Sequence, residues 1–461
     1  MTSAGRRLLA SAAAMLLAVS MASAVESASA GETDPGVKDT TPFAVGVAID
    51  QRETTGTAGV LVARNFDQVT AENHMKPDAW YDGQRSLRMH PQAAAILDFA
   101  SAHDLHVYGH TLVWYQQTPA WFFQNASSGQ ALGTSDADRA VLRERMRTHI
   151  FGVARLLSER SGLFGAGNPV NAFDVVNEVI SDGPESDGLR RSEWYRILGE
   201  EYIDLAFRYA DEAFNGVYAA PGVHRPVKLF INDYNTEYAS KRARYLALVD
   251  RLLARGVPVD GVGHQFHVGL TTPVDAMAQA IDAFASRPVT QAVTELDVPV
   301  GTPVTAERLE AQRTYYRDAF AVFHARASSL YSVSVWGLTD SRSWRAKDGA
   351  PLLFADDYSP KPAFYGVLEA APAPTGVLNA TTRCVAGRIV VVTTVENRGA
   401  SAAAVTVTSP YGSRALRVAA GTKASVAVST RAATVPVGEV TVSSTDLVFG
   451  TDRSGYAAVT C

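Results

Sequence analysis

The sequence predicts a closed (β/α)8 TIM barrel followed by a small all-β sandwich domain. Between residues 42 and 370, eight short apolar runs alternate with longer segments of helical periodicity. The runs repeatedly end in polar or charged residues, as expected of barrel strands that meet a ligand at their carboxyl ends. Beyond residue 370 the chain becomes rich in Val, Thr, Ser and Ala in alternating runs. An open, doubly wound sheet is the alternative for the first part, because it would not need an eighth strand.

Each predicted strand is a short apolar run, and each predicted crossover helix is a longer segment between two runs. The strands are predicted at Phe43–Ile49, Gln68–Thr70, Leu105–Gly109, Phe173–Val176, Lys228–Ile231, Gly261–Gly263, Val289–Thr294 and Ser332–Gly337. The helices are predicted at residues 57–65, 91–103, 136–160, 193–215, 238–256, 273–286 and 305–328.

The first thirty residues have the features of a cleaved secretory signal peptide. Arg6 and Arg7 precede an apolar run from Leu8 to Val19, and small residues follow at 22–24 and 28–30. A membrane anchor would need about 20 continuous apolar residues, and this run is shorter and broken by Ser. We therefore expect a secreted, extracellular protein; the paired Arg leaves a twin-arginine export route open.

The rest of the chain divides into a catalytic barrel over residues 41–370, a linker over 371–378 and a β-sandwich over 379–461. The linker is predicted from the Pro, Ala and Gly of AAPAPTG. Cys384 and Cys461 are the only cysteines, and in an exported chain they predict a disulfide that closes the tail.

Two functions are open for the tail. A binding module for flat polysaccharide surfaces usually presents exposed aromatic side chains, but residues 375–461 contain only Tyr411, Phe449 and Tyr456 and no Trp. This composition favours an immunoglobulin-like spacer or attachment domain over a carbohydrate-binding module.

The charge of the chain excludes one class of partner. The 42 basic and 47 acidic residues are mixed along the sequence and give a net charge of −5. No block of Lys and Arg is available to follow a phosphate backbone, so nucleic acid is not an expected partner.

Two glutamates stand at the ends of predicted strands, Glu178 after the fourth and Glu295 after the seventh. Cleaving a glycosidic bond needs a proton for the departing oxygen and a second carboxylate for the sugar carbon. Burial and mutual repulsion would keep one of such a pair protonated and the other ionised. Taken singly, a Glu after a strand more often begins the next helix, where it favours the helix dipole.

Seven ordered motifs carry a family resemblance over residues 43–369. In the order of the chain they are TAENHMK, GHTLVW, FDVVNE, GHQFH, TELD, WGLTDSRSW and PLLFADDYSPKPAF. Together they resemble family 10 of the glycoside hydrolases, the retaining endo-β-1,4-xylanases. The resemblance implies hydrolysis of internal xylan bonds by double displacement, with Glu178 as general acid/base and Glu295 as nucleophile. Retention also implies that the two carboxyl groups lie about 5–5.5 Å apart.

The resemblance assigns roles to the neighbours of these glutamates. His267 and Asp297 resemble the pair that orients the nucleophile, and Asn177 resembles the amide that contacts the nucleophile or the sugar 2-hydroxyl. Taken alone, a His after a strand is more often structural.

Other positions match residues that bind sugars. Asn73, Lys76, His110 and Gln265 match family positions upstream of the cut, although helix capping or a solvated ammonium would explain some of them. Trp114, Trp336 and Trp344 follow strands and suit stacking on pyranose rings, with core packing as the alternative. Asn232 and Tyr234 are weaker candidates for the leaving-group side.

The chain departs from the family pattern at Tyr115, where the family usually has His, and at Pro77. These departures concern the fine shape of the sugar subsites rather than hydrolysis itself.

Two other function classes are alternatives to a xylanase. A metal-dependent hydrolase on the same barrel would use His74, His110, His264 and His267, but catalytic zinc generally needs three protein ligands around an open site. A non-catalytic carbohydrate-binding barrel would lack one of the two carboxylates. We expect no metal or other cofactor, xylan as the partner, no membrane contact after signal removal, and a monomer.

Overall fold

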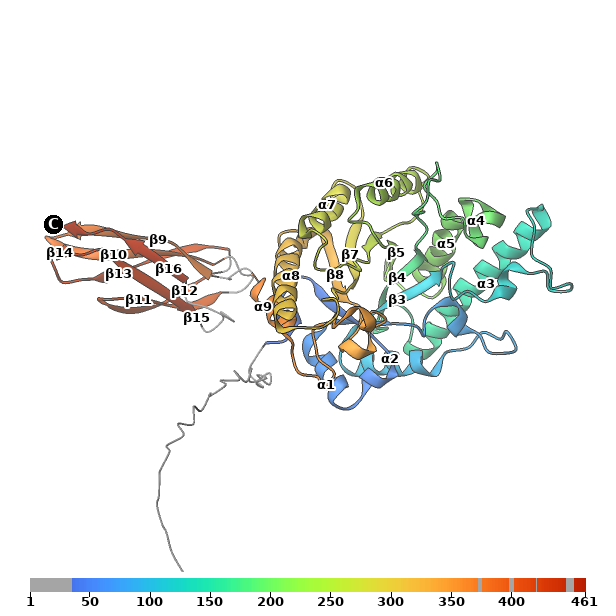
Figure 1. The fold of residues 1–461 in the computed structure, drawn as a ribbon, viewed down its shortest axis with the longest axis horizontal. Helices are drawn as coiled ribbons and strands as arrows, with labels where there is room; N and C mark the ends of the chain where they lie inside the picture. The colour runs from blue at the N-terminus through green and yellow to red at the C-terminus, as the bar shows by residue number, and fades with distance from the viewer. Residues whose placement is uncertain (1–34, 372–374, 398–401, 420, 445–451) are drawn as a thin grey trace, which may run out of the picture.

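A computed structural model describes residues 35–371, 375–397, 402–419, 421–444 and 452–461. The predicted signal peptide and Phe449 lie outside the described residues. The described chain forms a barrel and a separate β domain (Figure 1). Within these ranges, no helix has both the length and the apolar character needed to cross a membrane.

The barrel prediction is confirmed. Eight parallel strands close in sequence order, and β1 pairs with both β2 and β8, which excludes the open sheet. The strands are β1 (Ala44–Ile49), β2 (Gln68–Ala71), β3 (His106–Val113), β4 (Val170–Asn177), β5 (Lys228–Asp233), β6 (Gly261–His264), β7 (Thr290–Leu296) and β8 (Leu330–Val335).

Helices surround the barrel (Figure 1). The predicted helix over 193–215 is three elements, because Gly199 adopts a φ of 66° and ends the first one. These are α4 (Glu193–Leu198), α5 (Glu201–Glu212) and the π-helix η5 (Ala213–Val217). The other helices are α1 (Gly56–Asn65), α2 (Pro91–Ala102), α3 (Asp136–Ser161), α6 (Ala239–Ala254), α7 (Val274–Phe284), α8 (Ala306–His324) and α9 (Pro362–Glu369).

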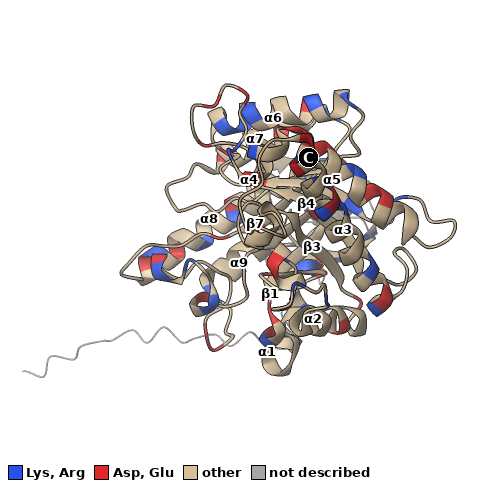
Figure 2. Cartoon of the chain, turned by 90° about the vertical axis from the view of Figure 1, so that its right-hand side faces the viewer, with Lys and Arg blue, Asp and Glu red and all other residues tan. Residues whose placement is uncertain are grey.

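Acidic and basic residues are interspersed along these helices in Figure 2, as the mixed sequence predicts. Arg143 on α3, for example, pairs with Glu201 on α5 at 2.9 Å. Such exposed pairs contribute little stability each.

Six strands, β2 to β7, extend further toward their carboxyl ends than predicted. The added residues are Ala71 in β2, His110 to Val113 in β3, Asn177 in β4, Asn232 and Asp233 in β5, His264 in β6, and Glu295 and Leu296 in β7. The prediction ended β4 and β5 at their last apolar residue and β7 at Thr294, before the polar residues that follow. The polar residues continue the ladder because their side chains are buried against one another inside the barrel mouth.

The C-terminal domain consists of antiparallel sheets, as predicted. One sheet has the order β13-β10-β9, a second β12-β11-β15-β16, and a small third β14-β17. Val395 on β10 packs with Val405 and Val442 of the second sheet, so the two larger sheets share a core. The strands are β9 (Thr375–Val385), β10 (Arg388–Asn397), β11 (Ala403–Ser409), β12 (Gly412–Val418), β13 (Lys423–Ser429), β14 (Thr434–Val435), β15 (Gly438–Ser444), β16 (Asp452–Tyr456) and β17 (Val459–Thr460).

A disulfide joins Cys384 on β9 to Cys461, with the two Cα atoms 5.7 Å apart. The predicted pairing is therefore confirmed. Strand β9 begins at Thr375, inside the segment predicted as a linker over 371–378.

Candidate active site

A cleft of about 570 Å³ opens at the carboxyl ends of the barrel strands. Every residue predicted for the site lines it except Asp297 and Asn232, which lie beneath the surface. The predicted residues on its wall are Asn73, Lys76, His110, Trp114, Asn177, Glu178, Gln265, His267, Glu295, Trp336 and Trp344.

Glu178 is held in place through both its backbone and its side chain. It directly follows β4 with a φ of 57°, a left-handed conformation that is uncommon for a residue other than Gly. Its N–H donates to the Asn232 carbonyl at 2.8 Å, and its own carbonyl accepts from Arg190 Nε at 2.7 Å. Its carboxylate accepts from Trp114 Nε1 at 3.1 Å and from Gln265 Nε2 at 3.3 Å. These contacts fix the direction of the carboxyl group.

Glu295 is only 4% exposed and has a donor on each carboxylate oxygen. Asn232 Nδ2 donates to Oε1 at 2.8 Å, and His267 Nε2 lies 3.1 Å from Oε2. Burial raises the pKa of Glu295, but the bond from His267 and the positive charges of His110, His267 and Lys76 lower it further, so the net shift is downward. This environment favours an ionised Glu295.

Buried amides connect the two glutamates. Asn177 Oδ1 accepts from Asn232 Nδ2 at 3.1 Å and from Gln265 Nε2 at 3.2 Å. Asn232 also donates to Glu295, and Gln265 also donates to Glu178. Three amides therefore bridge the carboxylates of strands β4 and β7 across one cleft.

The position of Asn232 differs from the expectation. The sequence placed it on the leaving-group side, whereas it lies fully buried and donates to Glu295. Asn177, expected to contact the nucleophile or the sugar 2-hydroxyl, gives its amide oxygen to Asn232 and Gln265, and its contact with a sugar stays a prediction. The reason is the length of β5, which carries the Asn232 side chain into the barrel mouth.

His267 and Asp297 form the predicted pair. His267 Nδ1 lies 2.9 Å from Asp297 Oδ2, and the opposite ring nitrogen contacts Glu295. Burial lowers the pKa of His267, but the charge and hydrogen bond of Asp297, followed by those of Glu295, raise it to about 10. The ring is thus an imidazolium at neutral pH and carries a positive charge beside Glu295.

Asp297 is fully buried and makes two further contacts that the sequence did not predict. Trp344 Nε1 donates to Oδ2 at 3.0 Å, and Arg345 donates from an NH group to Oδ1 at 2.7 Å. Both donors follow β8, so this loop stabilises the charge that positions His267.

Lys76 lies on the wall formed after β2. Its ammonium donates to Asn73 Oδ1 at 3.1 Å and stands 5.1 Å from the centre of the Trp114 ring. Burial lowers the pKa of Lys76, an effect opposed by the charges of Glu295, Glu72 and Glu178.

Glu72 also lines the cleft, but the sequence analysis did not predict it as a site residue. Its position directly after β2 is the same signal that identified Asn73.

His110 is buried in β3 and contacts Asp174, whose Oδ2 lies 2.8 Å from Nδ1. Tyr108 donates to the other oxygen of Asp174 at 2.8 Å. The sequence analysis did not predict this role of Asp174, although an acidic residue inside the otherwise apolar run FDVV indicates a buried carboxylate that needs a partner. The pair orients His110, which meets the edge of Trp336 at a ring distance of 5.3 Å.

The three tryptophans differ in exposure. Trp114 and Trp336 are 8% and 6% exposed, whereas Trp344 is 58% exposed. Only Trp344 therefore presents a large open face, and the other two contribute polar or edge contacts within the wall.

Tyr115 and Tyr234 also line the cleft and are joined by Arg190. The guanidinium stands 4.7 Å from the Tyr115 ring, and its NH2 group donates to the Tyr234 hydroxyl at 2.7 Å. Arg190 also donates to the Glu178 carbonyl, so it links these two tyrosines to the predicted acid/base residue.

The histidines of the metal alternative each have a separate environment. His264 contacts Thr236 and Gln291, and His74 packs against the ring of His90 at 4.5 Å. In the part of the chain that the structure describes, no three His, Cys, Asp or Glu residues form a metal-binding group.

Comparison with known proteins agrees with this geometry. The family model "Glycosyl hydrolase family 10" matches residues 37–370. The "Exoglucanase XynX" of Acetivibrio thermocellus is 36% identical over 334 residues, covering 72% of this chain and 29% of that protein. The "Endo-1,4-beta-xylanase A" of Halalkalibacterium halodurans is 34% identical over 354 residues, 71% of this chain and 84% of its own.

A solved structure shares the barrel. The crystal structure of TsXylA, an intracellular xylanase from Thermoanaerobacterium saccharolyticum, superposes with a TM-score of 0.66 at 34% identity, covering 73% of this chain and 99% of that one. The chain spans less than a third of two longer curated relatives, 29% of XynX and 27% of the endo-1,4-β-xylanase A of the same Thermoanaerobacterium species.

Proposed function

Because the chain belongs to glycosyl hydrolase family 10, we propose that it is a retaining endo-1,4-β-xylanase that cuts internal bonds of xylan. The observation that carries this proposal is the amide-bridged pair of glutamates in one open cleft. Relatives at 34–36% identity that are named as xylanases support the choice of substrate.

In the first step Glu295 attacks the anomeric carbon of the upstream sugar and forms a glycosyl-enzyme ester. The glycosidic C–O bond breaks, and Glu178 transfers its proton to the departing oxygen. The imidazolium of His267 and the amide of Asn232 keep Glu295 ionised and aimed before the attack. Both groups are fixed in the free enzyme, so little reorganisation is needed.

In the second step Glu178, now a carboxylate, removes a proton from water, and the water oxygen attacks the anomeric carbon. The ester bond to Glu295 breaks, so the nucleophile is restored and the configuration of the sugar is retained. Trp114 and Gln265, which bond the two oxygens of Glu178, hold it in one position for both steps.

The roles of the two glutamates are separable by leaving group. An activated aryl xylobioside needs no proton, so Glu178→Ala should keep most of its glycosylation rate on that substrate and lose it on xylan by about 10²–10⁴-fold. Glu295→Ala should lose activity on both the aryl xylobioside and xylan. Glu144→Ala, an exposed change on α3, is the control and should keep both activities.

Proton NMR of the first product formed by the wild type should show the β-anomer. An initial α-anomer, or equal loss on both substrates in the Glu178 and Glu295 variants, would overturn the proposed mechanism. Reducing ends that appear without a fall in xylan viscosity would contradict the internal mode of cutting.

We also propose that the protein is exported and acts as a monomer. The signal-like composition of residues 1–30 and the disulfide of the tail support export. N-terminal sequencing of protein from the culture medium, together with its mass by light scattering, tests both points. Protein retained in the cells with Met1 intact would exclude export, and a mass of two chains would exclude the monomer.

A further inference from the structure

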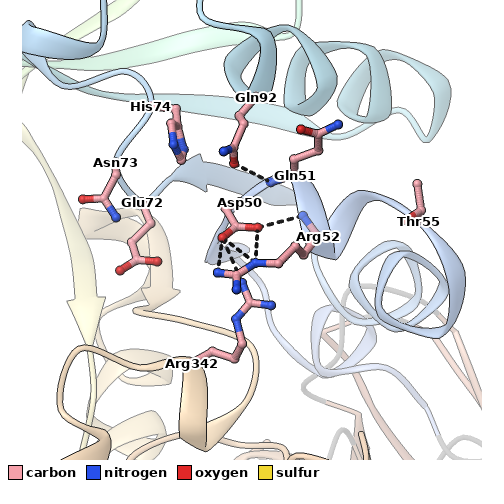
Figure 3. A pocket seen from close by; sticks show the side chains of 9 residues that line it. All are labelled: Asp50, Gln51, Arg52, Thr55, Glu72, Asn73, His74, Gln92 and Arg342. Carbon is pink, nitrogen blue, oxygen red and sulfur yellow. Dashed lines mark hydrogen bonds and ion pairs between the residues drawn. The ribbon is translucent and has the colours of Figure 1, made fainter.

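Two ion clusters lie at the mouth of the barrel and differ in what they hold. The first joins the segments after β1 and β8, where Arg52 and Arg342 each donate to Asp50 at 2.9 Å (Figure 3). The second follows β4, where Arg190 bonds directly to the turn that begins at Glu178. The second cluster therefore acts on a residue of the proposed reaction.

Arg190 holds the turn after β4 at three points through its side chain. Its Nε donates to the Glu178 carbonyl at 2.7 Å. Its NH2 group donates to the Ile180 carbonyl at 3.2 Å and to Asp182 Oδ2 at 3.0 Å. The backbone N–H of Arg190 also donates to the Val179 carbonyl at 2.8 Å. One residue thus fixes the path by which the chain leaves the strand.

The turn needs this support because Glu178 has a left-handed backbone conformation, with a φ of 57°. A residue other than glycine keeps such a conformation where the surrounding structure determines it. Here the Asn232 carbonyl accepts from the Glu178 N–H, and Arg190 donates to the Glu178 carbonyl. Rotation of this backbone would swing the carboxyl group away from the leaving oxygen, so the conformation of the turn and proton transfer are linked.

The guanidinium of Arg190 is itself confined. Its side chain is 19% exposed, and its centre stands 4.7 Å from the Tyr115 ring. The NH2 group also donates to the Tyr234 hydroxyl at 2.7 Å. Asp182, which balances the charge of Arg190, accepts a further bond from Lys241 at 2.7 Å. A planar guanidinium with several N–H donors suits this set of contacts, whereas an ammonium group is a point charge on a flexible stem.

We propose that Arg190 is a positioning residue for the acid/base Glu178, because it holds the turn so that the carboxyl group stays directed at the leaving oxygen. The inference rests on the proposed function, since it takes Glu178 as the proton donor. The Arg190 side chain is not part of the lining of the catalytic cleft, so it acts through Glu178 rather than on the sugar. Its loss should weaken proton transfer and leave the nucleophile Glu295 in place.

The test compares kcat/KM of the wild type and Arg190→Ala on aryl β-xylobiosides whose phenols differ in acidity. A strongly acidic phenol leaves without a proton, whereas a weakly acidic phenol needs one from Glu178. Arg190→Ala should lose about 10- to 100-fold on the least acidic phenol and less than about 3-fold on the most acidic one. A general disturbance of the structure would lower kcat/KM by the same factor for every phenol.

A second readout follows the glycosyl-enzyme. With the most acidic phenol, the ester on Glu295 should accumulate in Arg190→Ala, because Glu178 must also activate the water that releases the sugar. The values of kcat and KM should therefore fall together. Azide needs no general base: its nitrogen bonds to the anomeric carbon as the C–O bond to Glu295 breaks. Sodium azide should raise kcat of Arg190→Ala at least about 3-fold and leave that of the wild type unchanged.

Arg191→Ala is the matched control. Arg191 is the next residue along the chain, and its 44% exposed side chain pairs with Asp187 at 3.0 Å. This variant should keep the wild-type dependence on phenol acidity. Arg190→Lys keeps the charge but lacks the planar fork, so it should still lose at least about 5-fold more on the least acidic phenol than on the most acidic one. It carries the same comparison where Arg190→Ala does not fold.

An equal loss on every phenol in the Arg190 variants, with a wild type active on xylan, would overturn the positioning role and leave the xylanase proposal intact. Wild-type behaviour in Arg190→Lys would show that the charge alone is sufficient and would also overturn it. A wild type inactive on xylan and on every xyloside would overturn the proposed function and the positioning role together.

Discussion

At the scale of single residues, the site depends on buried polar side chains as much as on its two carboxylates. Asn232, Gln265 and Asp297 are at most 1% exposed, and each is satisfied by hydrogen bonds to other residues of the site. Burying such groups is costly unless every donor and acceptor finds a partner. Their network therefore holds Glu178 and Glu295 in fixed positions, and a change at one member disturbs the others.

The charge on His267 leads to a prediction about pH. In His267→Gln the nucleophile loses a positive neighbour, so the pKa of Glu295 should rise. Since Glu295 must be ionised to attack, the acidic limb of the kcat/KM profile should move to higher pH, and the maximum should fall about 10- to 100-fold. Profiles measured on an activated aryl xylobioside test this. His106→Gln, at an exposed histidine, should leave the profile in place. A lower rate with an unmoved acidic limb would contradict the electrostatic role.

The same histidine links stability to pH. Its pKa is raised in the folded protein to about 10, above the value of about 6.5 in an unfolded chain. Its contribution is therefore complete below about pH 6.5 and is lost as the pH rises toward 10. Denaturant unfolding between pH 6 and 10 should show a smaller loss of stability in His267→Gln than in the wild type. Parallel curves for the two proteins would exclude this linkage.

At the scale of elements, strand β6 is glycine-rich because neighbouring side chains occupy the space beside it. A Cβ added at Gly261 would lie 2.2 Å from the Phe230 ring, and one at Gly263 would lie 2.4 Å from Asn232 Oδ1. Both neighbours belong to β5, and both distances are too short for real contacts. The glycines thus allow β5 to place an aromatic ring in the barrel and an amide at the site.

Gly263→Ala tests this arrangement. The added methyl group should displace Asn232 and break its bond to Glu295, so we expect kcat/KM to fall about 10-fold or more and stability to fall by about 1–3 kcal/mol. Gly269→Ala is a matched control on the following loop, since a Cβ there meets no atom within 4 Å. Activity assays and chemical unfolding of the two variants give the comparison. Equal activities in the two variants would show that Asn232 tolerates the displacement.

The strands also show how far the sequence alone could predict the structure. The apolar runs predicted all eight strands, because alternating runs and helical segments report burial directly. The carboxyl ends of the strands were placed too early, since Asn232 and Glu295 are polar and their burial depends on partners from other strands. The hydrogen bond between these two residues could not be predicted for the same reason. It joins β5 to β7, and the local sequence pattern of one strand does not indicate which residues of another strand it contacts. The motifs predicted which residues line the cleft. The hydrogen bonds through which the amides connect the two glutamates, and the contacts of Arg190, could be identified only in the structure.

At the scale of the whole molecule, the tail shows no aromatic platform in its described part. Tyr456 is 4% exposed and belongs to a core cluster with Ala380, Val391 and Val440, against which Tyr411 packs. We therefore expect the tail to add no affinity for insoluble xylan. Depletion assays should give the same bound fraction for inactive Glu295→Ala chains that either keep the tail or end at residue 370. Stronger binding by the longer chain would show that the tail is a carbohydrate-binding module.

The disulfide should stabilise the tail without affecting the barrel. It closes a loop over a sequence separation of 77, for which the chain-entropy model gives about 4 kcal/mol. All six Trp residues precede residue 345, so tryptophan fluorescence reports only on the barrel. In Cys384→Ser/Cys461→Ser, the fluorescence transition and xylan hydrolysis should stay unchanged, while amide exchange in β9 and β10 should become much faster. Because β9 carries Cys384 and pairs with β10 along its length, these amides report on the loss of the cross-link. A shifted fluorescence transition would show instead that the tail and the barrel unfold together.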